Sequence, residues 1–248
     1  MFGCKPLTPG CLNCYAARCA GTLQTATDIA LYVGTTDLKA GRYTFNGELR
    51  VLPPGHPSWT FPRDWKGAAN PVLGPGKPSL LWISDMSELF LPGRPMAVID
   101  RTLGMVAISD HIGLVLTKCP NRLAAYFHNQ PRWRSKFWLG FSAERQIEFD
   151  QRWPALRTLA KRGWPIFVSI APMLGLVTFP RDFLDLCIWV ICSGEQGPSA
   201  HVRYMQPNWA RRVRDQCVAA GVPFFLKQMT GKKPIPPDLV MYQQFPKV

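Results

Sequence analysis

Six short apolar runs in the last two thirds of the chain constrain its fold more than any other feature. They are rich in β-branched and aromatic residues, and their apolar residues are continuous rather than alternating. The runs are Leu80–Ser84, Gly113–Thr117, Phe137–Ser142, Ile166–Ile170, Ile188–Ser193 and Pro223–Lys227. Continuous apolar runs of this length are typical of parallel strands that are covered on both faces.

Segments with helical spacing separate these runs. They are Pro95–Met105, Pro120–Phe127, Glu144–Arg162, and a segment from Asn208, expected as its N-cap, to Gly221 as its stop. Repeated alternation of strand and helix predicts one α/β domain, either a barrel or an open wound sheet. Ligands gather at the carboxyl ends of the strands in both architectures. The predicted strands end in polar residues, so we expect the site at that edge.

The charge balance indicates an anionic partner. The 248 residues include 29 Lys and Arg against 16 Asp and Glu, which gives a net charge of +13. The longest apolar stretch, Ile166 to Phe179, is interrupted by Pro172 and is shorter than the about 20 residues that span a bilayer. The amino-terminal residues lack the apolar centre of a signal peptide. We therefore expect a cytoplasmic protein with no membrane partner.

The cysteines suggest metal chemistry rather than disulfides. Four of the eight, Cys4, Cys11, Cys14 and Cys19, lie in the first twenty residues, whereas Cys119, Cys187, Cys192 and Cys217 are scattered through apolar segments as expected for core residues. A structural zinc site needs four ligands, and Cys19 is the nearby candidate for the fourth. Three thiolates on a [4Fe–4S] cluster instead leave one iron open for a ligand.

Several motifs together resemble a known family. Gly3-Cys4-x6-Cys11-x2-Cys14-Tyr15-Ala16 resembles the amino terminus of a phage and bacterial branch of radical S-adenosylmethionine (SAM) proteins that is catalogued as a domain of unknown function. Further matches follow in order along the chain: Asp85-Met86-Ser87-Glu88-Leu89-Phe90, Leu116-Thr117-Lys118, Trp138-Leu139-Gly140-Phe141-Ser142, Gly194-Glu195-Gln196-Gly197-Pro198, and Trp209 to Gln228.

The resemblance implies a fold and a domain plan. It implies an α/β protein, a partial (β/α)6 radical-SAM-type barrel with an abbreviated first strand, formed by residues 1–248 as a single domain. Its parts are a cluster loop (1–20), a Pro/Gly-rich connection (52–78) that Trp59 and Trp65 hold down, the β/α repeats (79–228) and a tail (229–248).

The resemblance also implies two cofactors, a [4Fe–4S] cluster and SAM. Cys4, Cys11 and Cys14 are then the iron ligands, their thiolates favoured by Lys5 and Arg18, with Tyr15 packed beside the cluster. Among the polar residues at strand ends, Ser84 and Asp85 suit the ammonium of SAM, and Lys118 and Ser142 suit its carboxylate. Glu195 suits the ribose or the substrate. Each of these residues can equally be a helix cap or a solvated loop residue.

Two positions depart from the family pattern. Ala171 stands where the family has a glutamate, and Cys119 stands where it has an arginine. With the cysteine trio intact, the loss of an acid and a base indicates a changed substrate rather than a lost activity.

Two basic patches favour nucleic acid as the anionic partner. Arg132 and Arg134 are interleaved with Trp133 and Trp138, and Arg211, Arg212 and Arg214 lie on one predicted helix. Cations bind phosphates and aromatic rings stack on unpaired bases, although a solvated helix face is an equal alternative for either patch.

The resulting hypothesis is a radical SAM enzyme, an isomerase or lyase, that acts on DNA or a modified nucleotide and takes electrons from a donor such as a flavodoxin or ferredoxin. The resemblance implies hypermodification of phage DNA, for example moving a glycine on the thymine methyl group from an N-linkage to a C-linkage, in the host cytoplasm. Two alternatives stay open: a radical SAM lyase for pyrimidine lesions, and a non-catalytic nucleic-acid-binding protein that contains zinc.

Overall fold

The computed structural model describes residues 1–24, 30–66, 78–197 and 201–247. The chain divides into two compact units. Unit 1 comprises Met1–Val115 and Arg132–Trp138, and unit 2 comprises Leu116–Pro131 and Leu139–Val248. The expectation of a single domain over residues 1–248 stays a prediction. None of the helices in the described ranges has the length and apolar content that a membrane crossing requires.

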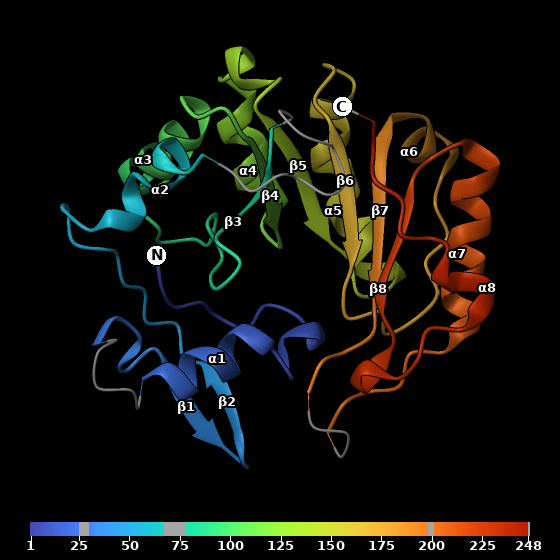
Figure 1. Cartoon of the computed structure of the whole chain (residues 1–248), viewed down its shortest axis with the longest axis horizontal. Coiled ribbons are helices and arrows are strands. Elements are labelled where there is room, and N and C mark those ends of the chain that lie inside the picture. The colour runs from blue at the N-terminus through green and yellow to red at the C-terminus, as the bar shows by residue number, and fades with distance from the viewer. Residues whose placement is uncertain (25–29, 67–77, 198–200, 248) are drawn as a thin grey trace. The chain divides into compact units, whose positions relative to one another are not determined.

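The larger sheet contains the six predicted strands (Figure 1). They are β3 (Leu80–Ile83), β4 (Ile112–Thr117), β5 (Phe137–Ser142), β6 (Ile166–Ile170), β7 (Cys187–Ser193) and β8 (Phe224–Gln228). The strand order in the sheet is the order in the chain, and the pairs β3–β4, β5–β6, β6–β7 and β7–β8 are parallel. A doubly wound sheet reverses its order at a switch point, whereas a barrel does not. The predicted α/β fold is confirmed, and its strand order is compatible with a partial barrel.

The helices that follow the strands of unit 2 form a continuous series. They are α4 (Pro120–His128), α5 (Gln146–Ala160), α6 (Arg181–Leu186) and α7 (Pro207–Ala220), and each contacts the next. The predicted stop of α7 is confirmed, since Gly221 caps it in the left-handed conformation. The predicted N-cap is wrong. Gln206 occupies that position, and the amide oxygen of Asn208 instead accepts a hydrogen bond from Arg211.

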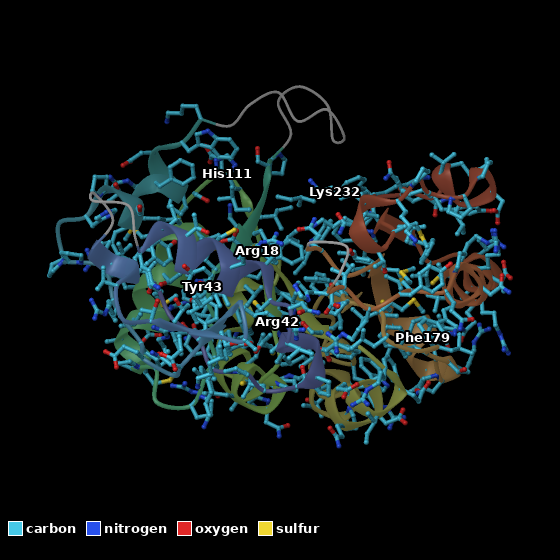
Figure 2. All side chains as sticks on the ribbon, turned by 90° about the horizontal axis from the view of Figure 1, so that it is seen from below. Arg18, Arg42, Tyr43, His111, Phe179 and Lys232 are labelled. Carbon is cyan, nitrogen blue, oxygen red and sulfur yellow. The ribbon has the colours of Figure 1, made fainter. Side chains whose placement is uncertain are left out.

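Aromatic side chains cover both faces of the sheet in unit 2. On one face Phe141 contacts Phe149 and Trp153 of α5 and Phe183 of α6, and Phe179, labelled in Figure 2, joins them. On the other face Phe167, Trp189 and Phe225 lie side by side on three neighbouring strands. Burial on both faces explains why these strands have no polar alternation.

Residues 237–246 form part of this packing. They begin with α8 (Pro237–Val240), and Phe225 then bridges to Gln243 beside β8. The indole nitrogen of Trp189 donates a hydrogen bond to the carbonyl of Gln244 at 2.9 Å, and the Phe245 ring lies against Trp189. The end of the chain is therefore attached to the sheet through the edge strand β8.

Unit 1 contains a helix and a hairpin that the apolar pattern does not predict. The helix α1 (Tyr15–Leu23) packs on the antiparallel pair β1 (Thr36–Lys39) and β2 (Arg42–Phe45). Gly21 allows this contact, because a Cβ there would lie 2.1 Å from the ring of Tyr43, which Figure 2 labels. The helix α3 (Met96–Ala107) leads from β3 to β4, close to its predicted range.

Trp59 and Trp65 pack the Pro/Gly-rich connection against the protein, as expected. It includes the short turns η3 (Pro57–Trp59) and α2 (Phe61–Asp64), and Trp59 is buried and donates to the carbonyl of Pro53 at 2.9 Å. Trp65 lies against the buried ring of His111, whose Nε2 is 2.8 Å from the Trp65 carbonyl oxygen. Residues 67–77 of the predicted connection lie outside the described residues.

We predict opposite effects for two glycine-to-alanine substitutions. A Cβ at Gly140 would lie 2.4 Å from the ring of Phe167, so Gly140→Ala should lower the free energy of unfolding by about 1–3 kcal/mol through overpacking. Gly104 lies in α3 with open space around it, so Gly104→Ala should raise stability by up to about 1 kcal/mol. Urea unfolding measures both. Equal effects from the two substitutions would contradict the packing described here.

Candidate functional site

The first cysteine is fixed by backbone pairing. Phe2 and Arg50 exchange two hydrogen bonds of 3.0 Å, and the carbonyl of Cys4 accepts from Gly47 at 3.1 Å. Between them Gly3 has a φ of +80°, and a Cβ there would lie 1.9 Å from the carbonyl oxygen of Glu48. Only glycine fits so close to the Glu48 carbonyl, because it has no Cβ and tolerates a positive φ. Gly3 therefore fixes the position of the next residue, Cys4, on unit 1.

The other two cysteines of the trio lie on the turn and helix that follow. Cys11 ends the 3-10 turn η1 (Pro9–Cys11), and the amide of Leu7 points at its sulfur, 3.5 Å away. Cys14 is the N-cap residue of α1, so its sulfur lies at the positive end of the helix dipole. Cys4, Cys11 and Cys14 are all half-buried, neither sealed in the core nor fully exposed.

Electrostatics couples the three thiols. The pKa of Cys4 is raised to about 12, mainly by burial and next by the Glu88 carboxylate, with smaller contributions from the thiols of Cys14 and Cys11. The largest charge effect on Cys4 therefore comes from an acid, and not from Lys5 or Arg18, which were expected to favour the thiolate. Binding of a metal group there must therefore release a proton from Cys4 at neutral pH. The Cys4 thiol thus interacts electrostatically with each of the other two thiols of the trio.

The predicted contact partners of the cluster lie beside this loop. The Tyr15 hydroxyl donates to the backbone carbonyl of Asp85 at 3.0 Å, and its pKa is raised by burial, by Asp85 and by Cys14. Met86 packs on the same apolar group as Cys4 and Cys14. Ser84 has the strained φ of +60° and begins a turn in which its carbonyl accepts from Ser87. Unit 1 thus brings the cysteine trio, Tyr15 and the Ser84–Asp85 turn together.

Cys19, the candidate fourth zinc ligand, lies on α1 and is half-buried. Within the described ranges no three His, Cys, Asp or Glu side chains converge closely enough to hold a single metal ion. Of the four cysteines expected in the core, Cys187, Cys192 and Cys217 are buried free thiols, whereas Cys119 is half-buried at the N-cap of α4.

In unit 2, two of the predicted residues surround a buried carboxylate. Glu144 is fully buried just after β5, and it forms ion pairs with Lys118 and, at 3.3 Å, with Arg152. Arg152 also donates to the backbone carbonyl of Ser142 at 2.7 Å. Two cations thus bind one buried carboxylate at the carboxyl ends of β4 and β5.

Glu195 has a different partner from the one expected. It is 3% exposed and holds Arg203, whose backbone amide donates to Oε2 at 2.8 Å and whose guanidinium binds both carboxylate oxygens. The Gly194-Glu195 turn is also tied to the end of β8, because Gly194 donates to the carbonyl of Gln228. This buried, paired carboxylate is neither the helix cap nor the solvated loop residue of the alternative. A ligand that binds the Glu195 carboxylate would have to share that carboxylate with Arg203.

Most of the predicted basic residues on α7 are neutralised locally. Arg211 and Arg214 form ion pairs with Asp238, and Arg214 also pairs with Asp215. Arg211 lowers the pKa of Asp238 to about 2. Arg212 is exposed, and no ion pair of its guanidinium occurs within the described residues. In unit 1, Arg132 lies over the Trp133 ring at 5.5 Å and Arg134 is exposed, so this patch keeps its charge.

Three residues of these sites were not assigned from the sequence. Glu88 lies in the Asp-Met-Ser-Glu-Leu-Phe motif, and Glu144 follows a predicted strand end. Both residues could therefore have been identified from the sequence as site candidates. Arg152 lies in the middle of a helix, and nothing in its sequence context distinguishes it from a solvated arginine.

Comparison with known proteins identifies one match. A family model described as "Protein of unknown function (DUF5131)" matches residues 1–237. No curated protein and no solved structure matches the chain.

We predict that Glu88→Gln raises the reactivity of Cys4 in the metal-free protein. Removing the negative charge lowers the pKa of Cys4, and alkylation follows the thiolate fraction, so its rate with iodoacetamide at pH 9 should rise about two- to tenfold. The glutamine can still accept the bond from the Phe90 amide. Mass spectrometry measures the rate, with the Cys187 peptide as an internal control that stays unreactive. An unchanged Cys4 rate would rule out electrostatic control by Glu88.

Proposed function

The chain belongs to the family described as "Protein of unknown function (DUF5131)", and from that premise we propose that it is a radical SAM enzyme of the isomerase or lyase class. The proposed substrate class is a nucleic-acid base. The most concrete substrate is a thymine whose methyl group bears glycine, as in hypermodification of phage DNA. The proposed electron donor is a small protein such as a flavodoxin or ferredoxin.

One observation carries the proposal: three half-buried thiols lie within residues 4–14, and the Cys4 thiol interacts electrostatically with the other two. The loop adds a backbone amide aimed at the Cys11 sulfur and a helix amino terminus at Cys14, and both stabilise thiolates. Cys4, Cys11 and Cys14 would hold a [4Fe–4S] cluster, and the chemistry it would supply is one-electron reductive cleavage of SAM, with the electron from the proposed donor, into methionine and a 5′-deoxyadenosyl radical that takes a hydrogen atom from the substrate.

The residues beside the loop suit the binding of a charged amino acid group. Asp85 presents an exposed carboxylate on the turn that Tyr15 ties to α1, so an ammonium could pair with it. This carboxylate supports binding of the ammonium group of SAM by unit 1.

A nucleic-acid substrate is supported by the net charge of +13 and by the Arg132–Trp133 pair. The absence of a carboxylate at Ala171 supports a substrate different from that of family members with glutamate there. Arg211 and Arg214 do not support a nucleic-acid substrate, because both are paired with aspartates.

We predict that anaerobic reconstitution with iron and sulfide gives a brown protein with about four irons and four sulfides per chain. Cys4→Ala, Cys11→Ala and Cys14→Ala should each abolish the absorbance near 400 nm, because each removes a ligand. Cys187→Ala should keep it, since Cys187 is a core residue.

Cys19→Ala separates this proposal from the zinc alternative. A zinc site built on this loop needs Cys19 as its fourth ligand, whereas the cluster does not. Retention of iron in Cys19→Ala therefore supports the proposal. Purified protein that holds one zinc and loses it in Cys19→Ala would overturn it.

We predict that the cluster-loaded protein, reduced with dithionite, converts SAM into methionine and 5′-deoxyadenosine, measured by chromatography. Asp85→Asn should raise the concentration of SAM needed for half-maximal turnover by about tenfold, since a charge-assisted hydrogen bond is lost. Asp110→Asn is a matched control, an exposed aspartate outside the Ser84–Asp85 turn. Intact SAM after incubation with a fully loaded, reduced cluster would contradict the proposed activity.

A further inference from the structure

The segments that follow β7 and β8 are joined by hydrogen bonds and carry a basic surface. The hydroxyl of the buried Thr230 donates to the carbonyl of Arg203 at 3.0 Å and accepts from the amide of Met205 at 2.9 Å. Gly231 donates to the carbonyl of Glu195 at 3.0 Å. These bonds join the segment that contains Tyr204 to the turn η5 (Thr230–Lys232), so the side chains on both are held in one place.

An exposed aromatic ring and three lysines occupy this surface. We call Tyr204, Lys227, Lys232 and Lys233 the β8 lysine surface. The Tyr204 side chain is 57% exposed, and the Lys233 ammonium lies 5.4 Å from its ring centre. Lys232, which Figure 2 labels on the segment after β8, has a φ of +59° beside Gly231 at +62°. All three lysines are exposed.

The charge of this surface is not compensated locally. Residues 201–206 and 226–237 contain no aspartate or glutamate, and none of the three lysines forms an ion pair with a described residue. The neighbouring carboxylate of Glu195 is buried and bound to Arg203. On α7, by contrast, Asp238 and Asp215 neutralise Arg211 and Arg214.

We propose that the β8 lysine surface binds a single-stranded polynucleotide, with the lysines on successive phosphates and the Tyr204 ring stacked on an unpaired base. Exposed rings beside unpaired cations are the combination that holds single strands without reading their sequence. The surface lies at the carboxyl ends of the strands, where α/β proteins bind their ligands. The choice of nucleic acid as the ligand rests on the proposed function. In this inference the β8 lysine surface, and not the arginines of α7, contacts the phosphates.

The experiment measures binding of a fluorescein-labelled 20-nucleotide oligothymidylate to the full-length, cluster-loaded protein by anisotropy over a range of salt concentrations. Tyr204→Ala should weaken binding about 5- to 150-fold, and Tyr204→Phe should restore it because stacking needs only the ring. Lys232→Gln with Lys233→Gln should reduce the slope of log affinity against log salt by about 1.4, since two phosphate contacts are lost.

Arg211→Gln with Arg214→Gln removes the same number of charges from α7 and should change the slope little, because those arginines are already paired. Iron content checks that each variant keeps its fold. The inference is overturned if the α7 variant reduces the slope while the lysine variant does not. It is also overturned if Tyr204→Phe binds as weakly as Tyr204→Ala, or if phosphatidylserine vesicles or a duplex of the same length bind more tightly than the oligonucleotide.

The failure of this inference and that of the proposed function are distinguishable. SAM cleavage by the wild-type protein is measured in parallel without nucleic acid. Cleavage without oligonucleotide binding would overturn the β8 lysine surface alone. Oligonucleotide binding with the expected variant effects but without SAM cleavage would support the surface and overturn the enzyme proposal.

Discussion

Burial of both faces of the parallel strands is the constraint on which the rest of the structure depends. With aromatic side chains filling both sides of the sheet in unit 2, polar groups can emerge only at the strand ends, where each must find a partner. Glu144 is held by Lys118 and Arg152, and Glu195 by Arg203. The same edge that collects functional groups in α/β proteins therefore also collects buried ion pairs. A polar residue at a strand end is accordingly weaker evidence for ligand binding than its position alone indicates.

The cysteine loop of unit 1 obeys a different constraint. Its cysteines are presented by a turn, a helix N-cap and a strained glycine rather than by strand ends, and they remain half-buried. Burial, and next the Glu88 carboxylate, raise the pKa of Cys4 to about 12, so this thiol is protonated at neutral pH.

The distribution of charge follows from which cations have acidic neighbours. The net charge of +13 is a property of the whole chain, but only unpaired cations can release counterions by binding phosphate. On α7 Arg211 and Arg214 are paired with Asp238 and Asp215, whereas the lysines of the β8 lysine surface form no ion pair with any residue that the structure describes. The density of arginines in the sequence is thus a poor guide to where an anion can bind.

The sequence by itself determined the six strands, the helices between them and the glycine stop of α7, because continuous apolar runs and caps are local signals. It also indicated the three cysteines as one group through their short spacing, although the position of Cys4 depends on backbone pairing with residues 47–50. Only the tertiary structure decided the partners of Lys118, Glu195 and Arg214, because those partners lie 26, 8 and 24 residues away along the chain. It also decided the packing of α1 on its hairpin, since a helix on a small antiparallel pair lacks the repeated strand pattern that marks the sheet. Strands, helices and caps depend on neighbouring residues and can be predicted from the sequence, whereas the pairing of charges depends on which distant side chains folding brings together.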